Sequence, residues 1–208
     1  MVTITTSKHR PRTARTRPAR ADVRADVLAA AREVFEELGY HRASTDLIAR
    51  RAGYSKGALY SNFDGKDDLF LALLAEEVAA RCEALAGGVA ADTDLGSLPE
   101  ALLAMARDSR ANLVFAEFRV HAARDVDLSL RLAEVRERLV GSVAERVAQE
   151  VAALGLELTV PAEDAATLLL AMINGLALEQ VGHAGPVVEV GSVTTLLGSL
   201  VRPRGGVS

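Results

Sequence analysis

The stretch STDLIARRAGYSKGALY, residues 44–60, decides how the first third of the chain folds. It holds a short apolar-periodic segment that ends near Ala52 and a second one expected over 56–62. Gly53 lies between them and supplies the positive φ that a tight turn between two helices requires. Two short helices joined by a glycine turn are typical of a helix-turn-helix, whose second helix enters the DNA major groove.

The flanking residues extend this pattern into a three-helix unit. Apolar residues recur every three or four positions from Asp22 to Leu38, and Gly39 is expected to end that helix. Ser44 or Thr45 is placed to cap the next helix. After the third helix, Asp64 is placed to cap a long helix over 66–86, which ends at two glycines.

The rest of the chain also shows helical periodicity. A loop is expected over 89–96, and Ser97 and Glu100 form a capping box for a helical region that reaches Arg124 with a break near 108–111. Asp127 is expected to cap a long helix ending at Leu154, and two further helices are expected over 162–182 and 187–201. No strand is expected, so the sequence predicts an all-α protein.

Composition agrees with closely packed helices. The chain has 208 residues, of which 50% are hydrophobic and only 4% aromatic, whereas strands favour aromatic and β-branched residues. A single cysteine, Cys82, excludes an internal disulfide. No apolar stretch is long enough to span a bilayer, so a cytoplasmic protein is expected, without a membrane partner and nucleoid-associated when bound to DNA.

Charge is divided unevenly along the chain. Residues 1–66 hold thirteen Lys and Arg against seven Asp and Glu, a net charge of +6, and the remainder carries −10. The positive part is expected to meet a polyanion. Residues 1–21 contain six basic groups, two prolines and no acid, and are interpreted as a flexible basic arm, either in contact with DNA phosphates or only solvated.

Three motifs carry a family resemblance: VLAAAREVFEELGY at 27–40, STDLIA at 44–49 and AGYSKGALY at 52–60. Together with Asn62, Phe63 and 66–69 they resemble the tetracycline-repressor (TetR) family of bacterial regulators. A weaker similarity, in 117–118 and 121–125, resembles the start of the effector-binding domain in a broad subgroup.

The resemblance implies an architecture and a function. A helix-turn-helix DNA-binding domain over 22–66 would follow the arm 1–21, and 67–208 would form a ligand-binding and dimerisation domain. The last two helices would pair with their copies in a homodimer that reads a palindromic operator in double-stranded DNA. A small-molecule effector would release a repressor from that operator, and no enzymatic activity, metal or cofactor is expected. An activator, and a helical adaptor without specific DNA binding, are the alternatives.

The resemblance also assigns residues. DNA contacts fall on Ser44, Thr45, Ser55, Lys56, Gly57, Ala58, Tyr60, Ser61, Asn62 and Lys66. Tyr60 and Lys66 would hold phosphates, as would Ser44 or Thr45, and the others would face base edges. Lys56 would donate to guanine and Asn62 would pair with adenine. A half-buried core tyrosine is the alternative for Tyr60.

The effector pocket is placed by resemblance among helices from about 97 to 182. Its candidate residues are Met105, Phe115, Phe118, His121, Met172 and Asn174. Ordinary core packing is an equal alternative for each of them. Glu117, His121 and Arg124 share one helix face, and they either line that pocket or form an internal polar network.

Departures and rival motifs need separate interpretation. Ala43, Thr45 and Tyr54 differ from the residues usual in the family, and the Tyr54 ring either packs inward or approaches the DNA backbone. Residues 53–57 also match G-x-S-x-G, but that motif needs a preceding strand, which is not expected here. The histidines show no metal-ligand spacing with Cys82, which is either an inert thiol or a redox sensor.

Overall fold

The computed structural model describes residues 20–86, 98–107 and 109–204. Its elements are α1 (Arg20–Arg42), α2 (Thr45–Arg51), α3 (Lys56–Tyr60), α4 (Lys66–Ala86), α5 (Leu98–Arg107), α6 (Ser109–Ala122), α7 (Val126–Ala153), β1 (Leu156–Leu158), α8 (Ala162–Glu179), α9 (Val190–Ser199) and β2 (Val201–Pro203). The expected arm up to Ala19, the loop 89–96 and the capping serine 97 lie outside these residues. The prediction of an all-α protein is confirmed.

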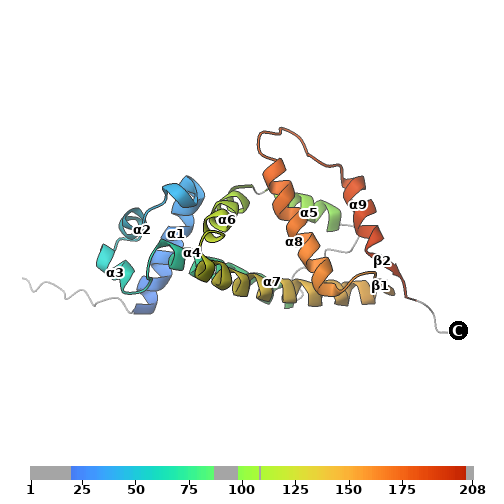
Figure 1. The fold of residues 1–208 in the computed structure, drawn as a ribbon, viewed down its shortest axis with the longest axis horizontal. Coiled ribbons are helices and arrows are strands. Elements are labelled where there is room, and N and C mark those ends of the chain that lie inside the picture. The colour runs from blue at the N-terminus through green and yellow to red at the C-terminus, as the bar shows by residue number, and fades with distance from the viewer. Residues whose placement is uncertain (1–19, 87–97, 108, 205–208) are drawn as a thin grey trace, which may run out of the picture.

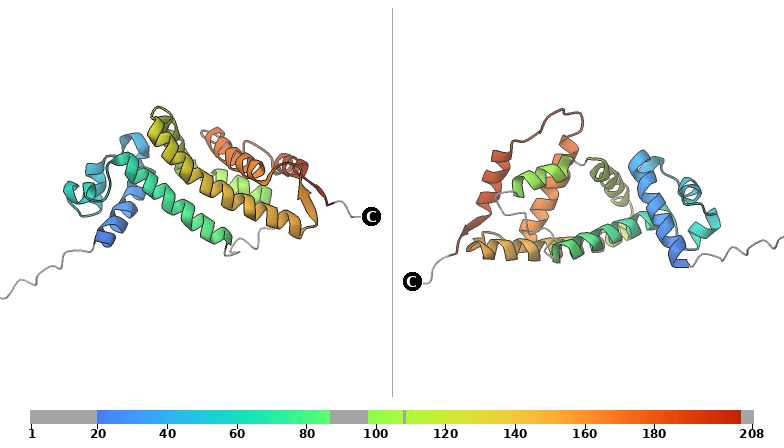
Figure 2. Two further views of the ribbon diagram at one scale, coloured as in Figure 1. Left: turned by 60° about the horizontal axis from the view of Figure 1, so that its bottom comes forward. Right: turned by 180° about the vertical axis from the view of Figure 1, so that it is seen from behind.

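The molecule is elongated, with the three helices α1–α3 at one end (Figure 1). Helix α7 runs along most of its length, and α4 packs beside α7 (Figure 2). Helices α5, α8 and α9 gather at the other end. We call α1–α3, with the turn that follows them (residues 20–65), the head, and residues 98–204 the body; α4 connects the two.

The predicted stop at Gly39 is confirmed, although helical geometry resumes for one turn after it. Gly39 has φ 77° and ψ 170°, outside the helical region, so α1 is kinked there before it ends at Arg42. The Ala43 N–H donates to the Gly39 carbonyl at 3.3 Å, which closes the final turn. This kink turns the chain toward α2.

Helix α7 begins two residues earlier than predicted. Asp125, and not Asp127, is its N-cap: it has extended backbone angles and its carboxylate accepts the Leu128 N–H at 3.0 Å. Asp127 lies in the first turn, where a negative charge still favours the positive end of the helix dipole. Leu154, expected to continue the apolar stripe, follows the helix and is exposed.

The expectation of no strand is wrong in one place. β1 and β2 form a two-stranded antiparallel sheet in which Glu157 pairs with Arg202. Each strand has three residues, too few to show the alternation by which strands are identified in a sequence. Only the return of the chain end to the residues after α7 reveals the pairing.

Helices α8 and α9 are both shorter than expected. Helix α8 ends at Glu179, because Gln180 forms its C-cap and Gly182 then takes φ +84°. Helix α9 starts at Val190, after Glu189 in an extended conformation. In the part of the chain that the structure describes, no helix is both long enough and apolar enough to cross a membrane.

One hydrophobic core joins the head to the neighbouring helices. Its buried residues come from α1–α4 and also include Val114, Phe118 and Ala122 of α6 and Leu128 of α7. Phe118 is fully buried and its ring lies 4.4 Å from Phe70 and 5.1 Å from Tyr40, measured between centroids. A second, smaller core lies between α5, α8 and α9. The head therefore packs as a continuation of the body.

Candidate DNA-binding face and effector cavity

Serine caps position the two short helices of the head. The Ser44 Oγ accepts the Leu47 N–H at 3.3 Å, and the Ser55 Oγ accepts the Ala58 N–H at 3.2 Å. Ser44, and not Thr45, is thus the N-cap of α2. Gly53 takes φ +79° in the turn between the helices, as its placement in the sequence predicts.

Helix α3 has five residues and is anchored by the buried Leu59. Its remaining surface is open: Ser55, Lys56, Gly57, Tyr60 and Ser61 are exposed, and Ala58 is partly buried. Ile48 and Ala49 hold α2 against the same core. The short helices therefore bury one side and present the other to solvent at the end of the molecule.

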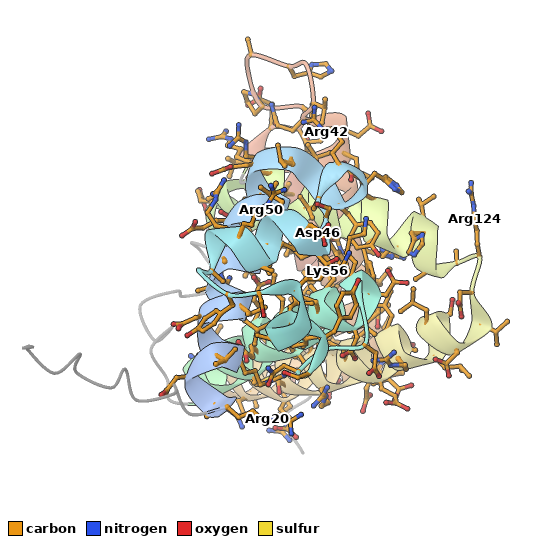
Figure 3. All side chains as sticks on the ribbon, turned by 90° about the vertical axis from the view of Figure 1, so that its left-hand side faces the viewer. Arg20, Arg42, Asp46, Arg50, Lys56 and Arg124 are labelled. Atoms are coloured by element: carbon orange, nitrogen blue, oxygen red, sulfur yellow. The ribbon has the colours of Figure 1, made fainter. Side chains whose placement is uncertain are left out.

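Lys56 is paired in the free protein. Its Nζ lies 2.8 Å from Asp46 Oδ1, and both side chains are more than half exposed. The hydrogen bond and charge of Asp46 raise the pKa of Lys56. The two residues lie together near the centre of the end view in Figure 3. Because such exposed pairs are worth little, a stronger anion is able to displace Asp46.

Tyr60 stands on the exposed side of α3 with 45% of its surface accessible. Its hydroxyl lies 3.2 Å from Thr45 Oγ1, and the Lys56 ammonium lies 5.8 Å from its ring centroid. Two hydroxyls and one cation thus gather between the start of α2 and the exposed surface of α3. A phosphate is the kind of group that this set suits.

Two predicted contact residues are engaged inside the head. Asn62 donates from Nδ2 to the Ala58 carbonyl at 2.9 Å, and its Oδ1 accepts from Arg20 at 3.3 Å. The Lys66 ammonium donates to the carbonyls of Tyr40 and Ala43 at 2.9 and 3.3 Å. Burial lowers the pKa of Lys66, although neighbouring carboxylates oppose this.

Three arginines on the same end of the molecule are absent from the sequence-based list. In the end view of Figure 3, Arg42 and Arg50 lie above Lys56 and Arg20 lies well below it. All three are exposed and, within the described residues, form no ion pair. Each uses one or two donors on a backbone carbonyl or Asn62. The positive charge of residues 1–66 signals them, but only the fold shows which arginines face outward. Arg51, by contrast, is held by Glu37 at 2.9 Å.

The open alternatives for Tyr54 and for the Glu117 face are resolved by their contacts. The partly buried Tyr54 donates its hydroxyl to Asp26 of α1 at 2.7 Å, so the ring packs inward. Glu117 accepts the His41 N–H at 3.2 Å, and the His121 Nε2 lies 3.2 Å from Asp67 Oδ2. These two belong to a polar junction between head and body.

Arg124 and Cys82 lie outside that junction. Arg124 is exposed and projects away from Lys56 in Figure 3. Cys82 is partly buried on α4 and its thiol lies 3.9 Å from the Arg138 carbonyl. Within the described residues, no group of three His, Cys, Asp or Glu side chains is arranged to hold a metal ion.

A cavity of about 130 Å³ lies between the head, α4 and the body. Of the six predicted pocket residues, Met105, Phe115 and Asn174 line it. Phe118 is in the core behind it, His121 contacts Asp67, and Met172 packs in the second core. Residues of α1 and α4 form one wall; the resemblance, which placed the pocket in 97–182, did not indicate them.

A second cavity, of about 300 Å³, lies near the two-stranded sheet. Its walls are almost entirely aliphatic and come from α5, α7, α8, α9 and both strands. It contains none of the predicted pocket residues.

Comparison with known proteins places this geometry in a family. Residues 27–73 match the family model of bacterial regulatory proteins of the tetR family. Over 207 aligned residues the chain is 30% identical to the HTH-type transcriptional repressor BepR of Brucella suis, covering 91% of this chain and 97% of BepR. The HTH-type transcriptional activator FasR of Mycolicibacterium smegmatis is 49% identical over 59 residues, which are 28% of this chain and 27% of FasR. The chain thus aligns with only about a quarter of FasR.

The solved structure of GusR from Salmonella enterica has the same fold. It superposes with a TM-score of 0.64 at 25% identity and covers 86% of this chain and 95% of that one. BepR and FasR are transcriptional regulators, and they argue against an adaptor that does not bind DNA. The full-length similarity to BepR, together with the helix-turn-helix, shows that the chain belongs to the TetR family of DNA-binding transcriptional regulators and is not an enzyme.

Proposed function

We propose that this chain is a repressor that binds a palindromic operator as a homodimer and leaves it when a small effector binds the body. The observation that carries the proposal is the open, cation-rich side of α2 and α3 at one end of the molecule (Figure 3). Helix α3 is narrow enough for the major groove, and its exposed start carries Ser55, Lys56 and Gly57.

Lys56 is the proposed base-reading residue. On DNA, the Lys56 ammonium would leave Asp46 and donate to the O6 and N7 atoms of guanine. One exposed ion pair is then replaced by a charge-assisted hydrogen bond to the base. Asp46 then remains beside the groove, where it repels phosphates but accepts from the N4 amine of cytosine. The pair thereby favours a particular base over unspecific attraction to the backbone.

Phosphate contacts are proposed for the hydroxyl pair of Thr45 and Tyr60 and for Arg42 and Arg50. Each arginine retains free N–H donors after its bond to a carbonyl. Ser44, Ser55 and Ser61 contribute through their exposed positions, and Gly57 and Ala58 allow close approach. Asn62 and Lys66 are proposed instead to hold the ends of α3 and α1 in place.

Homodimerisation is proposed through α8 and α9. Leu168, Ala171, Gly175 and Leu178 lie on α8 at spacings of three or four residues, and all of them are exposed. Such a stripe of leucines and small residues lets two helices approach closely. Leu196 on α9 is 54% exposed and extends the apolar surface. A two-fold axis through these helices places two heads for two operator half-sites.

Effector release is proposed to act through the first cavity. Its walls join α1 and α4 to the body, so a ligand there contacts the head directly. A ligand that prefers one spacing of the two heads shifts the population toward it, and coupling of this kind is typically worth about 1–3 kcal/mol. BepR is a repressor and FasR an activator; the full-length similarity to BepR favours repression.

Selection of DNA on the purified full-length protein tests the proposal. Fragmented genomic DNA is captured at low and at near-physiological salt, sequenced, and followed by anisotropy titrations on the recovered sites. We expect a short inverted repeat at both salt concentrations and a reporter gene that is silenced when the repeat lies in its promoter. Recovery without a common sequence, lost at higher salt, refutes an operator-specific repressor. Reporter activation in place of silencing identifies an activator.

A further inference from the structure

The cavity between α1, α4 and the body has a wall whose composition indicates what it binds. Apolar side chains form most of it, among them Phe35, Phe70, Val114, Phe115, Leu132 and Ile173. Its volume of about 130 Å³ is close to the roughly 150 Å³ of an apolar protein cavity that holds one benzene molecule. An apolar group of about ring size therefore fits.

Four charged side chains also line this cavity, and they differ in what they contact. Arg32 and Glu77 form an ion pair with each other. Glu36 is exposed and remains hydrated. Arg136 on α7 is partly buried, and within the described residues neither a hydrogen bond nor a carboxylate satisfies its guanidinium. Of the four charged side chains, Arg136 is thus the one that is partly removed from water without a hydrogen-bond or ion-pair partner among the described residues.

The surroundings of Arg136 make this isolation costly. Burial lowers the pKa of Arg136, and the positive charge of Arg119 on α6 lowers it further. Two other arginines of α7 are paired: Arg131 lies 2.6 Å from Asp68 and Arg146 lies 2.6 Å from Glu150. A partly buried cation beside a second cation and without an acceptor favours an anion that brings two oxygens.

We propose that this cavity binds a small organic carboxylate, whose carboxylate group pairs with Arg136 and whose ring-sized apolar part fills the space between α4, α6 and α8. The inference rests on the proposed function, since it names the chemical class of the effector. It explains why an arginine without an ion-pair partner lies in a wall made mostly of apolar side chains.

The position of the ligand also links it to the head. Phe35 of α1 and Phe70 of α4 line the cavity and belong to the core that contains Tyr40 and Phe118. The Phe35 and Phe70 rings meet edge to face at 4.9 Å. A carboxylate held from α7 presses its apolar part against this aromatic pair, so binding is expected to change how α1 sits on the body.

Calorimetry on the full-length protein without DNA tests the ligand class. The probes are benzoate, phenylacetate and hexanoate, with benzyl alcohol as the neutral and benzylamine as the cationic counterpart. We expect at least one carboxylate to bind, and to bind about tenfold or more tightly than both counterparts, since a charge-assisted hydrogen bond is lost without the anion.

Variants locate the site. Arg136→Gln is expected to abolish the preference for the anion, and Arg136→Lys to restore part of it because a single ammonium replaces a bidentate group. The matched control is Arg138→Gln on the same helix, which is exposed and does not line the cavity, and which keeps wild-type binding. Unfolding midpoints of the ligand-free variants verify that each one folds. We expect them to fold, because replacing an unpaired cation breaks no ion pair.

Two results overturn the inference: none of the three carboxylates binds more tightly than the alcohol, or Arg136→Gln retains wild-type affinity for the carboxylate. Operator binding without ligand is measured separately by anisotropy. If the protein binds its operator and the carboxylates fail, the ligand class is wrong and the DNA-binding function stands. If the carboxylates bind with the predicted dependence on Arg136 and no operator is found, the ligand class is right and the proposed DNA-binding function is wrong.

Discussion

The head and the body treat apolar side chains differently. In the head, every large apolar side chain except Tyr60 is buried or partly buried, and the exposed surface is mostly polar and rich in arginine. Apart from Tyr60, the large apolar side chains found exposed in the described residues lie in the body, including Leu168, Leu178 and Leu196. The body also lines both cavities, one of them together with α1 and α4.

This difference fits separate proposed functions: DNA binding by the head, and dimerisation and ligand binding by the body. The large apolar side chains of the head are covered by its own helices and by α4, α6 and α7, so its outer surface is free for a charged polymer, and serine caps fix the starts of its two short helices. The body leaves apolar surface exposed and cavities unfilled, and both features are typical of places where another molecule binds. A partner copy and a ligand are the two occupants proposed above.

The largest expected effect concerns the apolar stripe of α8. The double change Leu168→Glu and Leu178→Glu places charges in the proposed interface and is expected to give a monomer by sedimentation velocity. Operator affinity then falls by about 10²–10⁴-fold, because each head binds alone. Leu130→Glu on α7 is the control, since Leu130 is equally exposed but lies outside α8 and α9. A dimeric double variant contradicts the proposed interface.

The next effect concerns the kink where the head meets the body. Gly39 has φ +77°, and a Cβ there lies 2.9 Å from Glu117 Oε1. Gly39→Ala is expected to cost about 3 kcal/mol in urea unfolding, since backbone strain adds to displacement of the carboxylate. Gly141→Ala, within α7 and with open space around it, is expected to stabilise by about 0.5–1 kcal/mol. Equal effects of both changes argue against strain at Gly39.

Base reading by Lys56 produces an effect of intermediate size. Lys56→Ala is expected to lose about 1–3 kcal/mol of discrimination at one position in each half-site, measured by anisotropy on operators with single base changes. Arg50→Ala is the comparison: it is expected to weaken all sequences alike and to reduce the salt dependence of binding. If Lys56→Ala weakens binding to all sequences equally, Lys56 contacts a phosphate and does not read a base.

A smaller effect is expected from changing Asp46, which pairs with Lys56 when no DNA is bound. Asp46→Asn removes the carboxylate that pairs with Lys56 and repels phosphates. Affinity for random duplex DNA is expected to rise about two- to fivefold, in keeping with the small worth of an exposed ion pair. Operator affinity rises less, so the ratio of specific to unspecific binding falls. An unchanged ratio indicates that Asp46 has no part in selection.

The smallest effect concerns the polar junction between head and body. Burial raises the pKa of Asp67, but hydrogen bonds from Tyr40 and His121 and the charge of Lys66 outweigh it, so the net pKa is lowered. Its stabilising contribution is therefore complete above the ordinary carboxyl pKa near 4 and is lost as pH falls through the lowered value. Asp67→Asn is expected to make the free energy of unfolding depend less on pH between about pH 5 and pH 2. A pH profile parallel to wild type rules out this contribution.

Local chemistry explains what was predictable. Glycine at 39 and 53, serine at 44 and 55 and helical periodicity act over a few residues, so the all-α fold and the three-helix head follow from the sequence. The cap of α7 was misplaced by two residues because Asp125 and Asp127 are both suitable caps. The β1–β2 pair was missed because its partners are far apart in the chain.

The candidate sites needed the tertiary structure. In sequence, Lys56 and Lys66 are equivalent cations, yet only Lys66 meets the carbonyls at the end of α1. Phe115 and Phe118 are one helical turn apart, and only Phe115 reaches the cavity. The helices, the glycine turn at Gly53 and the positive charge of the first third follow from the sequence alone. Which cations are free, which aromatic rings line a cavity and which leucines remain uncovered depended on long-range packing, because a side chain's partners come from helices distant in the chain.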